Sequence, residues 1–171
     1  MASARSPGRR RASCTPRAGS CPATQPSSWA GRCKVERIQP QRIDGLAAPY
    51  FAGCREGELR LQHCPSCGHW QFYPRPFCTA CGAEAPAWEA ASGQGTVASF
   101  SVVRRGLSPA YEAPYTVALV DLAEGPRMMS VIIGCEPEAV TVGAPVTVCF
   151  EQWSEDLSLP VFRLDETGGV K

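Results

Sequence analysis

Four cysteines in two closely spaced pairs are the residues of this sequence best suited to chemistry. The pairs are Cys64 with Cys67 and Cys78 with Cys81, and a glycine follows each pair directly. Two residues between cysteines allow a tight turn to direct both sulfurs at one ion, and the glycine supplies the positive φ that such a turn needs. Four thiolates at about 2.3 Å form the tetrahedral shell of zinc. The spacing therefore predicts a zinc ribbon with these four ligands.

The predicted ion is structural, because a shell of four cysteines is closed whereas catalytic zinc keeps one position open. Such an ion contributes on the order of 10–16 kcal/mol of folding free energy in small zinc peptides, enough to fold a lobe of this size. Iron uses the same ligands and is the less expected metal. His63 and His69 flank the first pair and are expected to be neighbours of the site rather than ligands.

Independent catalysis is poorly provided for in this chain. His63 and His69 are its only histidines, and general acid–base catalysis or activation of a nucleophile usually calls for a histidine or a perturbed carboxylate. No G-x-S-x-G motif is present, and Gly93 and Gly95 open a predicted strand rather than a helix, which excludes a glycine-rich phosphate loop. We therefore predict no catalytic residue.

The elements that must hold the cysteines are predicted from periodicity. Alternation over 58–63 predicts a strand that enters the first pair. The prolines Pro74 and Pro76 predict an edge or irregular strand between the two pairs. Four aromatic side chains of that segment are expected to cover the metal site: Trp70, Phe72, Tyr73 and Phe77.

A short helix is expected just before the ribbon. Pro49 suits its first turn and Gly57 its end, which would place Tyr50, Phe51 and Cys54 on one face. A helix this short is marginal alone. It needs a surface to pack on, and both this chain's own barrel and a partner protein remain open.

The rest of the chain is predicted to be all β. Runs at 96–103, 115–122, 127–133, 145–153 and 161–164 predict five strands, and 135–143 has room for one turn of helix. Five short strands with one longer connection fit a Greek-key barrel of the OB type, with two stacked small sheets as the alternative. The predicted division is a disordered basic extension (1–40), a helical segment (41–57), the zinc ribbon (58–90), the OB-fold domain (91–166) and a tail (167–171).

Charge is divided unevenly along the chain. Residues 1–40 carry eight basic side chains and one acidic one, whereas residues 41–171 carry nine basic and fifteen acidic ones and sum to −6. Nucleic-acid affinity comes mainly from clustered Lys and Arg that neutralise phosphates, and the expected folded part lacks such a cluster. Because zinc ribbons and OB barrels commonly bind single-stranded nucleic acid, such a binding module is the alternative function, and electron transfer through iron at the four-cysteine site is a third.

The expected location is the cytoplasm. No apolar stretch approaches the roughly 18–20 residues needed to cross a bilayer, and no apolar segment follows the basic N-terminus, so we expect neither a membrane span nor a secretory signal. The chain has ten cysteines, but four have metal-ligand spacing, which argues against a secreted disulfide scaffold.

In combination, these motifs resemble one family. They run from Leu61-Gln62-x-Cys-x-x-Cys-Gly through Tyr73-Pro74-Arg75 and the second Cys-x-x-Cys-Gly to Trp88 and Ser92-Gly93-x-Gly95-Thr96-Val97, then on to Pro114-Tyr115 and Gly143…Val146. The sequence resembles the zinc-ribbon plus OB-fold family of acyl-CoA-associated proteins, long described as a domain of unknown function. The match covers about residues 45–164.

That resemblance implies a rubredoxin-like ribbon before an OB-fold barrel, with the family's zinc ligands on Cys64, Cys67, Cys78 and Cys81. It also implies an accessory, non-catalytic subunit that supports a thiolase-fold enzyme or a hot-dog-fold hydratase acting on CoA thioesters in lipid, sterol or polyketide metabolism. Contacts with CoA phosphates or acidic partner residues are assigned to four arginines, for which solvated surface is the competing interpretation: Arg75, Arg104, Arg105 and Arg127.

Overall fold

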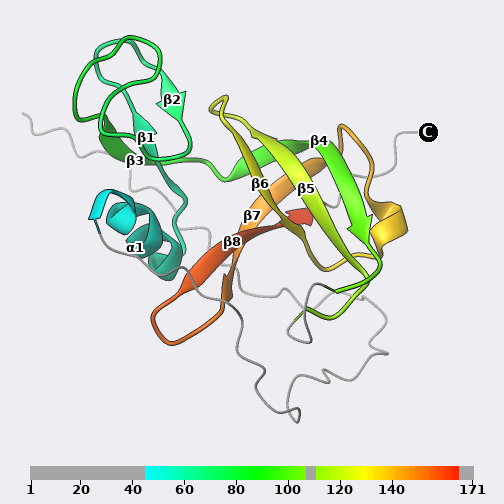
Figure 1. Cartoon of the computed structure of the whole chain (residues 1–171). Helices are drawn as coiled ribbons and strands as arrows, with labels where there is room; N and C mark the ends of the chain where they lie inside the picture. Colours follow the sequence, from blue (N-terminus) through cyan, green and yellow to red (C-terminus); the bar gives the residue numbers. More distant parts are fainter. Residues whose placement is uncertain (1–44, 107–110, 166–171) are drawn as a thin grey trace, which may run out of the picture. The chain divides into compact units, whose positions relative to one another are not determined.

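The computed structural model describes residues 45–106 and 111–165 (Figure 1). These residues all belong to one unit of the chain, Lys34–Lys171. The predicted basic extension (1–40) and the predicted tail (167–171) lie outside the described residues. In the described part, no helix is long and apolar enough to cross a membrane.

The first element is a short helix, as the sequence predicts. A 3₁₀ turn, η2 (Gly45–Ala47), leads into α1 (Ala48–Glu56), which carries a proline in its first turn. Gly57 ends the helix in the left-handed conformation at φ 76°, and its N–H donates to the Cys54 carbonyl. Tyr50 and Cys54 are buried in the core that α1 shares with the barrel. The chain's own core therefore covers one face of this helix.

The ribbon is a small three-stranded antiparallel sheet in the order β2-β1-β3. Its central strand is β1 (Arg60–His63), flanked by β2 (Trp70–Gln71) and β3 (Ala87–Ala90). Successive side chains of a strand point to opposite faces. Leu61 accordingly enters the apolar core, while Gln62 is buried on the other face. The strand β3 was not predicted from the sequence.

A closed five-stranded barrel follows, in the order β4-β5-β6-β8-β7. Its strands are β4 (Gln94–Val103), β5 (Tyr115–Leu122), β6 (Arg127–Ile132), β7 (Pro145–Gln152) and β8 (Ser158–Leu164). All pairings are antiparallel except that of β6 with β8, where Ile132 pairs with Phe162. A single 3₁₀ turn, η3 (Pro137–Ala139), interrupts the longest connection. The predicted mostly-β fold with an OB-type barrel is confirmed, and two separate sheets are excluded.

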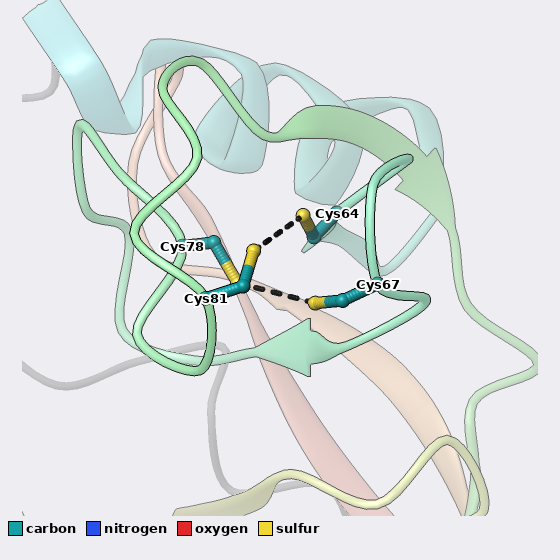
Figure 2. A group of neighbouring side chains, drawn as sticks. All are labelled: Cys64, Cys67, Cys78 and Cys81. Carbon is teal, nitrogen blue, oxygen red and sulfur yellow. Dashed lines mark hydrogen bonds between the residues drawn. The ribbon is translucent and has the colours of Figure 1, made fainter.

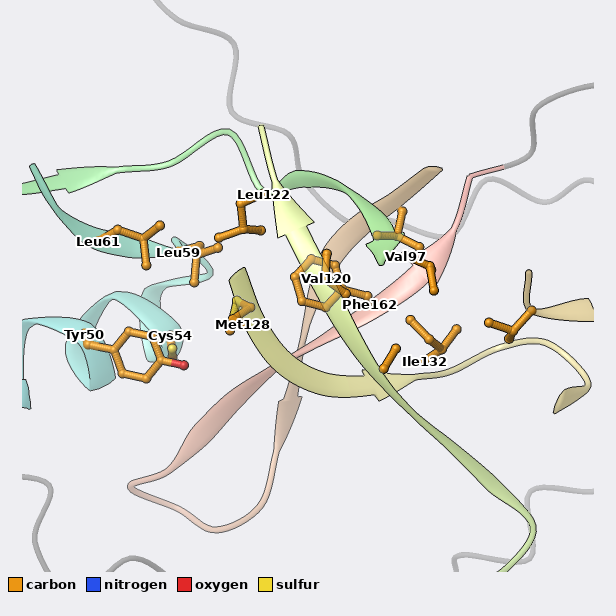
Figure 3. Packing of buried hydrophobic residues seen from close by; sticks show 13 residues of the cluster. Tyr50, Cys54, Leu59, Leu61, Val97, Val120, Leu122, Met128, Ile132 and Phe162 are labelled. Atoms are coloured by element: carbon orange, nitrogen blue, oxygen red, sulfur yellow. The ribbon is translucent and has the colours of Figure 1, made fainter. Parts of the chain in front are cut away.

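The barrel core consists of alternate inward side chains. Figure 3 shows Val97, Val120 and Phe162 within it, all at most 1% exposed, and the same cluster continues to Leu59 and Leu61 beside the ribbon. Burial along β5 alternates strictly, as period-two patterning requires. The ribbon and barrel thus share one continuous apolar core.

The residue directly before β4 is a glycine that no other residue could replace without movement of its neighbours. Gly93 has φ 76°, and a Cβ there would lie 2.3 Å from the Val148 side chain. Its carbonyl accepts a hydrogen bond from the Val148 N–H at 2.8 Å. This close approach joins β7 to the segment that leaves the ribbon.

Candidate metal centre

The four predicted cysteines converge on one point (Figure 2). All four Sγ atoms lie within 4.8 Å of one another. The Cys64 and Cys81 sulfurs are 3.7 Å apart, as are those of Cys67 and Cys78. Both distances far exceed the roughly 2.05 Å of a disulfide. They match the edge, about 3.8 Å, of a tetrahedron with metal–sulfur bonds of about 2.3 Å.

Two matching turns present the sulfurs. The Gly68 N–H donates to the Cys64 carbonyl at 2.8 Å, and the Gly82 N–H donates to the Cys78 carbonyl at 2.9 Å. Both glycines have positive φ, 71° and 76°. The predicted function of the glycines, to close a tight turn after each pair, is confirmed.

Backbone donors adjust the protonation of the buried sulfurs. Burial by itself raises the pKa of Cys64, but N–H groups of Cys67 and Ser66 and the thiols of Cys67 and Cys81 hydrogen-bond to its sulfur, and the net effect lowers that pKa to about 6. At Cys78, the N–H groups of Cys81 and Ala80 likewise lower the thiol pKa, against the effect of burial. N–H···S bonds stabilise thiolates, which are the form that binds metals.

Four converging sulfurs, two of them buried and held by N–H donors, fit a structural metal ion. The donor set leaves no position for substrate, because four thiolates complete a tetrahedral shell. The histidines lie outside it. His63 Nδ1 is 2.9 Å from a Glu89 carboxylate oxygen and its ring stacks on Trp70, while His69 Nε2 is 3.2 Å from the Thr79 hydroxyl.

A polar network supports the loop between the two cysteine pairs. The Gln62 side-chain oxygen accepts from the Arg75 N–H at 2.7 Å and from Gln71 Nε2 at 2.8 Å, and Gln62 Nε2 donates to the Arg75 carbonyl at 2.9 Å. The Gln71 oxygen accepts from the Thr79 N–H at 2.9 Å, one residue beyond Cys78. Both glutamines are at most 5% exposed. Sequence reasoning missed this network, since a glutamine in an alternating strand is usually taken to face solvent.

The aromatic residues of this loop do not form the cover predicted for the metal. Phe72 packs against the apolar core and forms an aromatic contact with Tyr50 of α1. Tyr73 and Phe77 are 59% and 50% exposed. Trp70 likewise packs against the apolar core, and its ring stacks on His63 beside the first cysteine pair. For Phe72 the prediction is wrong, because β2 ends at Gln71 and the chain then turns Phe72 towards the core.

The four predicted arginines are not brought together. Arg127 forms a bidentate ion pair with Asp121, and Arg104 pairs with Glu138. Arg104 and Arg105 follow the far end of the ten-residue strand β4, which begins on the ribbon side, so about 30 Å of strand separates them from that side. Arg75 differs in that it lines a small cavity between the ribbon and the turn from β5 to β6, which contributes Pro126.

Known proteins match this architecture on both parts. Residues 51–87 match the family described as "ChsH2, rubredoxin-like zinc ribbon domain", and residues 88–151 match "ChsH2, C-terminal OB-fold domain". A DUF35 domain-containing scaffold protein of Methanothermobacter thermautotrophicus is 34% identical over 95 residues, which are 54% of this chain and 71% of that protein. The chain belongs to the DUF35 family.

Longer relatives contain a DUF35 region as one part. A probable enoyl-CoA hydratase alpha subunit of Thermomonospora curvata is 35% identical over 76% of this chain and 41% of its own length. A 3-oxo-4,17-pregnadiene-20-carboxyl-CoA hydratase alpha subunit of Mycobacterium tuberculosis is 30% identical over 78% of this chain and 43% of its own length. The chain therefore spans about two-fifths of these relatives.

Solved DUF35 structures have the same fold. A chain of the structure titled "Ltp2-ChsH2(DUF35) aldolase" is 34% identical with a TM-score of 0.68, over 74% of this chain and 98% of that chain. A DUF35 protein of Sulfolobus solfataricus, of unknown function, is 16% identical with a TM-score of 0.52, over 70% of this chain and 85% of that chain. The second likeness concerns the fold alone.

Proposed function

We propose that this chain is a non-catalytic accessory subunit of an enzyme that acts on acyl-CoA thioesters. The observation that carries the proposal is the similarity to nearly the whole DUF35 chain of a structure titled as an aldolase with ChsH2. Two hydratase alpha subunits and scaffold proteins among the relatives support the same assignment. The partner is a thiolase-fold or a hot-dog-fold enzyme, and the complex operates in the cytoplasm.

The chemistry of the described residues suits a supporting subunit. The metal cluster is closed, and both histidines contact ribbon side chains. Of the four arginines assigned to CoA or partner contacts, Arg104 and Arg127 already pair with carboxylates. Arg75 is the best placed for such a contact. These ion pairs, and the net charge of −6 over residues 41–171, weigh against nucleic-acid binding.

The ion of the ribbon is zinc in this proposal, held by Cys64, Cys67, Cys78 and Cys81. Four thiolates in a tetrahedron accept either zinc or iron. Elemental analysis of freshly purified protein, together with a visible spectrum, separates the two. Zinc predicts about one equivalent of zinc and a colourless solution, whereas iron predicts charge-transfer absorption.

The test of the accessory function uses the full chain with an affinity tag, expressed in its native cells. We expect an acyl-CoA enzyme to co-purify in fixed stoichiometry, and we expect its turnover of CoA thioester to fall when the chain is removed and to recover when it is added back. The chain alone should not turn over the thioester. Isolation as a lone monomer, or a partner whose turnover is independent of the chain, would contradict the proposal.

A further inference from the structure

The four cysteines of the metal cluster differ in their access to solvent. Cys64 and Cys78 are at most 1% exposed, whereas Cys67 and Cys81 are exposed. Each C-x-x-C pair therefore has a buried first cysteine and an exposed second cysteine. A small solute that approaches the cluster from solvent meets Cys67 and Cys81 first.

Each exposed sulfur lies next to a buried sulfur of the other pair (Figure 2). The Sγ atom of Cys67 is 3.7 Å from that of Cys78, and the Sγ atom of Cys81 is 3.7 Å from that of Cys64. Both contacts cross from one turn to the other. A disulfide needs the two sulfurs at about 2.05 Å, so an approach of the two turns is enough to join each pair.

This arrangement has the chemistry of a thiol oxidation site. In the metal-loaded protein all four sulfurs are thiolates, since metal binding requires deprotonated cysteine. Thiolates are the form that peroxides oxidise to sulfenic acid, and a neighbouring thiolate converts the sulfenic acid to a disulfide. Redox sensors typically combine an accessible cysteine with a second cysteine that resolves it, and disulfides of cytoplasmic proteins are usually transient and catalytic or redox-sensing.

We propose that the cluster is a peroxide-responsive switch, in which Cys67 and Cys81 react first and Cys78 and Cys64 complete the disulfides. Each exposed thiolate attacks hydrogen peroxide, so that an S–O bond forms, the O–O bond breaks and hydroxide leaves. The adjacent buried thiolate then attacks the sulfenic sulfur, an S–S bond forms, the S–O bond breaks and a second hydroxide leaves. In total, four thiolates give four electrons to two peroxide molecules and yield the disulfides Cys67–Cys78 and Cys64–Cys81. Neutral disulfides no longer bind the divalent ion, which is released.

Loss of the ion reaches the loop between the two cysteine pairs. The N–H of Thr79, one residue beyond Cys78, donates to the side-chain oxygen of Gln71 at 2.9 Å. The same loop carries Phe72 and Tyr73, which line an apolar groove of about 600 Å³ beside α1. Oxidation should therefore loosen this loop and that wall of the groove while the barrel keeps its apolar core. The switch belongs to the chain itself and does not depend on which enzyme the chain supports.

The test treats the metal-loaded full chain with hydrogen peroxide in the presence of a chromogenic metal chelator. We expect metal release at least 10-fold faster than without peroxide, and rebinding of about one equivalent after dithiothreitol and metal are added. Dimedone, which alkylates sulfenic acids, should label Cys67 and Cys81 and leave Cys64 and Cys78 unlabelled. Without dimedone, peptide mapping under non-reducing conditions should find the two disulfides that cross between the pairs.

The matched control is Cys135→Ser, a change of a cysteine outside the cluster, which should release metal at the wild-type rate. Amide exchange of the oxidised protein should lose protection over residues 60–90 and keep it in the barrel strands. The inference fails if the metal stays bound under peroxide that oxidises free glutathione, if dimedone labels the buried cysteines, or if the disulfides form within each C-x-x-C pair. Unchanged amide exchange after oxidation would equally overturn it. All of these measurements use the chain alone, so their failure leaves the accessory function standing.

Discussion

The ribbon and the barrel lie side by side in one chain but are stabilised differently. The barrel buries apolar side chains, such as Val120, Val146 and Phe162, each 0% exposed. On the metal side of β1, the ribbon instead buries two cysteines and two glutamines: Cys64, Cys78, Gln62 and Gln71. The barrel therefore depends on the hydrophobic effect, and the ribbon depends on metal bonds and hydrogen bonds.

The strand β1 belongs to both regions. Leu61 on one face joins the apolar core, and Gln62 on the other face holds the loop that carries the second cysteine pair. One strand therefore connects the metal-held sheet to the apolar core. We expect the ribbon and the barrel each to be stabilised mainly by their own interactions. A substitution in the ribbon should therefore alter mainly the stability of the ribbon, and a substitution in the barrel mainly that of the barrel.

The largest expected effect is loss of the metal. Cys78→Ser removes a buried ligand, and metal bonds contribute on the order of 10–16 kcal/mol in zinc peptides. We expect bound metal to fall from about one equivalent to almost none, and amide-exchange protection to vanish over the ribbon while persisting in the barrel strands. Cys135→Ser, in a cysteine outside the cluster, should keep the metal. A metal-replete Cys78→Ser protein would be the contradictory result.

The next largest effect is expected from a substitution in the barrel core, which leaves a cavity there and does not touch the ribbon. Phe162 is 0% exposed and pairs across the β6–β8 junction, so Phe162→Ala should cost about 3–5 kcal/mol of unfolding free energy. Urea unfolding followed by circular dichroism measures this. Phe77→Ala, at a side chain that is 50% exposed, should change it little. Metal content should remain near one equivalent in both variants. Metal loss in the folded Phe162→Ala protein would contradict the separate stabilisation of ribbon and barrel.

A smaller effect is expected from the glutamine network. Gln62→Met keeps the side-chain length but leaves the Arg75 N–H and carbonyl without their partner, which costs about 1–3 kcal/mol. Transfer of the metal to a chromogenic chelator should be faster than in the wild type. Gln94→Met, at an exposed barrel residue, is the matched control and should transfer metal at the wild-type rate. Equal rates for the two variants would show that the network does not support the site.

The smallest effect concerns alkaline pH at the helix. Burial raises the pKa of the Cys54 thiol from 9.0 to about 12. The folded state keeps this proton above pH 9 while the unfolded state loses it. The contribution of the Cys54 thiol to the free energy of unfolding is therefore complete below pH 9 and declines as pH rises towards 12. The decline is at most about 1.4 kcal/mol per pH unit. Urea midpoints of Cys54→Ala should fall less steeply between pH 8 and 10.5 than those of the wild type. Parallel profiles would show that the Cys54 thiol does not cause the loss of stability at alkaline pH.

Much of the fold could be predicted because local signals are strong. The run Tyr115–Leu122, apolar and rich in β-branched residues, is β5 to the residue, and its burial alternates without a break. Pro49 and Gly57 bracket α1 as helix-start and helix-end residues should. The second pair, Cys78 and Cys81, could be predicted as ligands beside the first, because each C-x-x-C-G turn is encoded by the residues within it.

The parts that escaped prediction depend on contacts distant in sequence. The strand β3 has four residues and is defined by its pairing with β1, including Gln62 with Trp88. The buried state of Gln71 depends on the loop that covers it, and the parallel contact of Ile132 with Phe162 depends on barrel closure. The sequence positions of the four arginines likewise do not show which of them lie far apart in the folded barrel.

The measurement that tests the account most directly is native mass spectrometry of the tagged full chain isolated from its own cells. The account predicts a complex that contains an acyl-CoA enzyme in whole-number stoichiometry, with the mass of one zinc ion on each copy of this chain. A metal-free monomer with no bound enzyme, from folded protein, would contradict it.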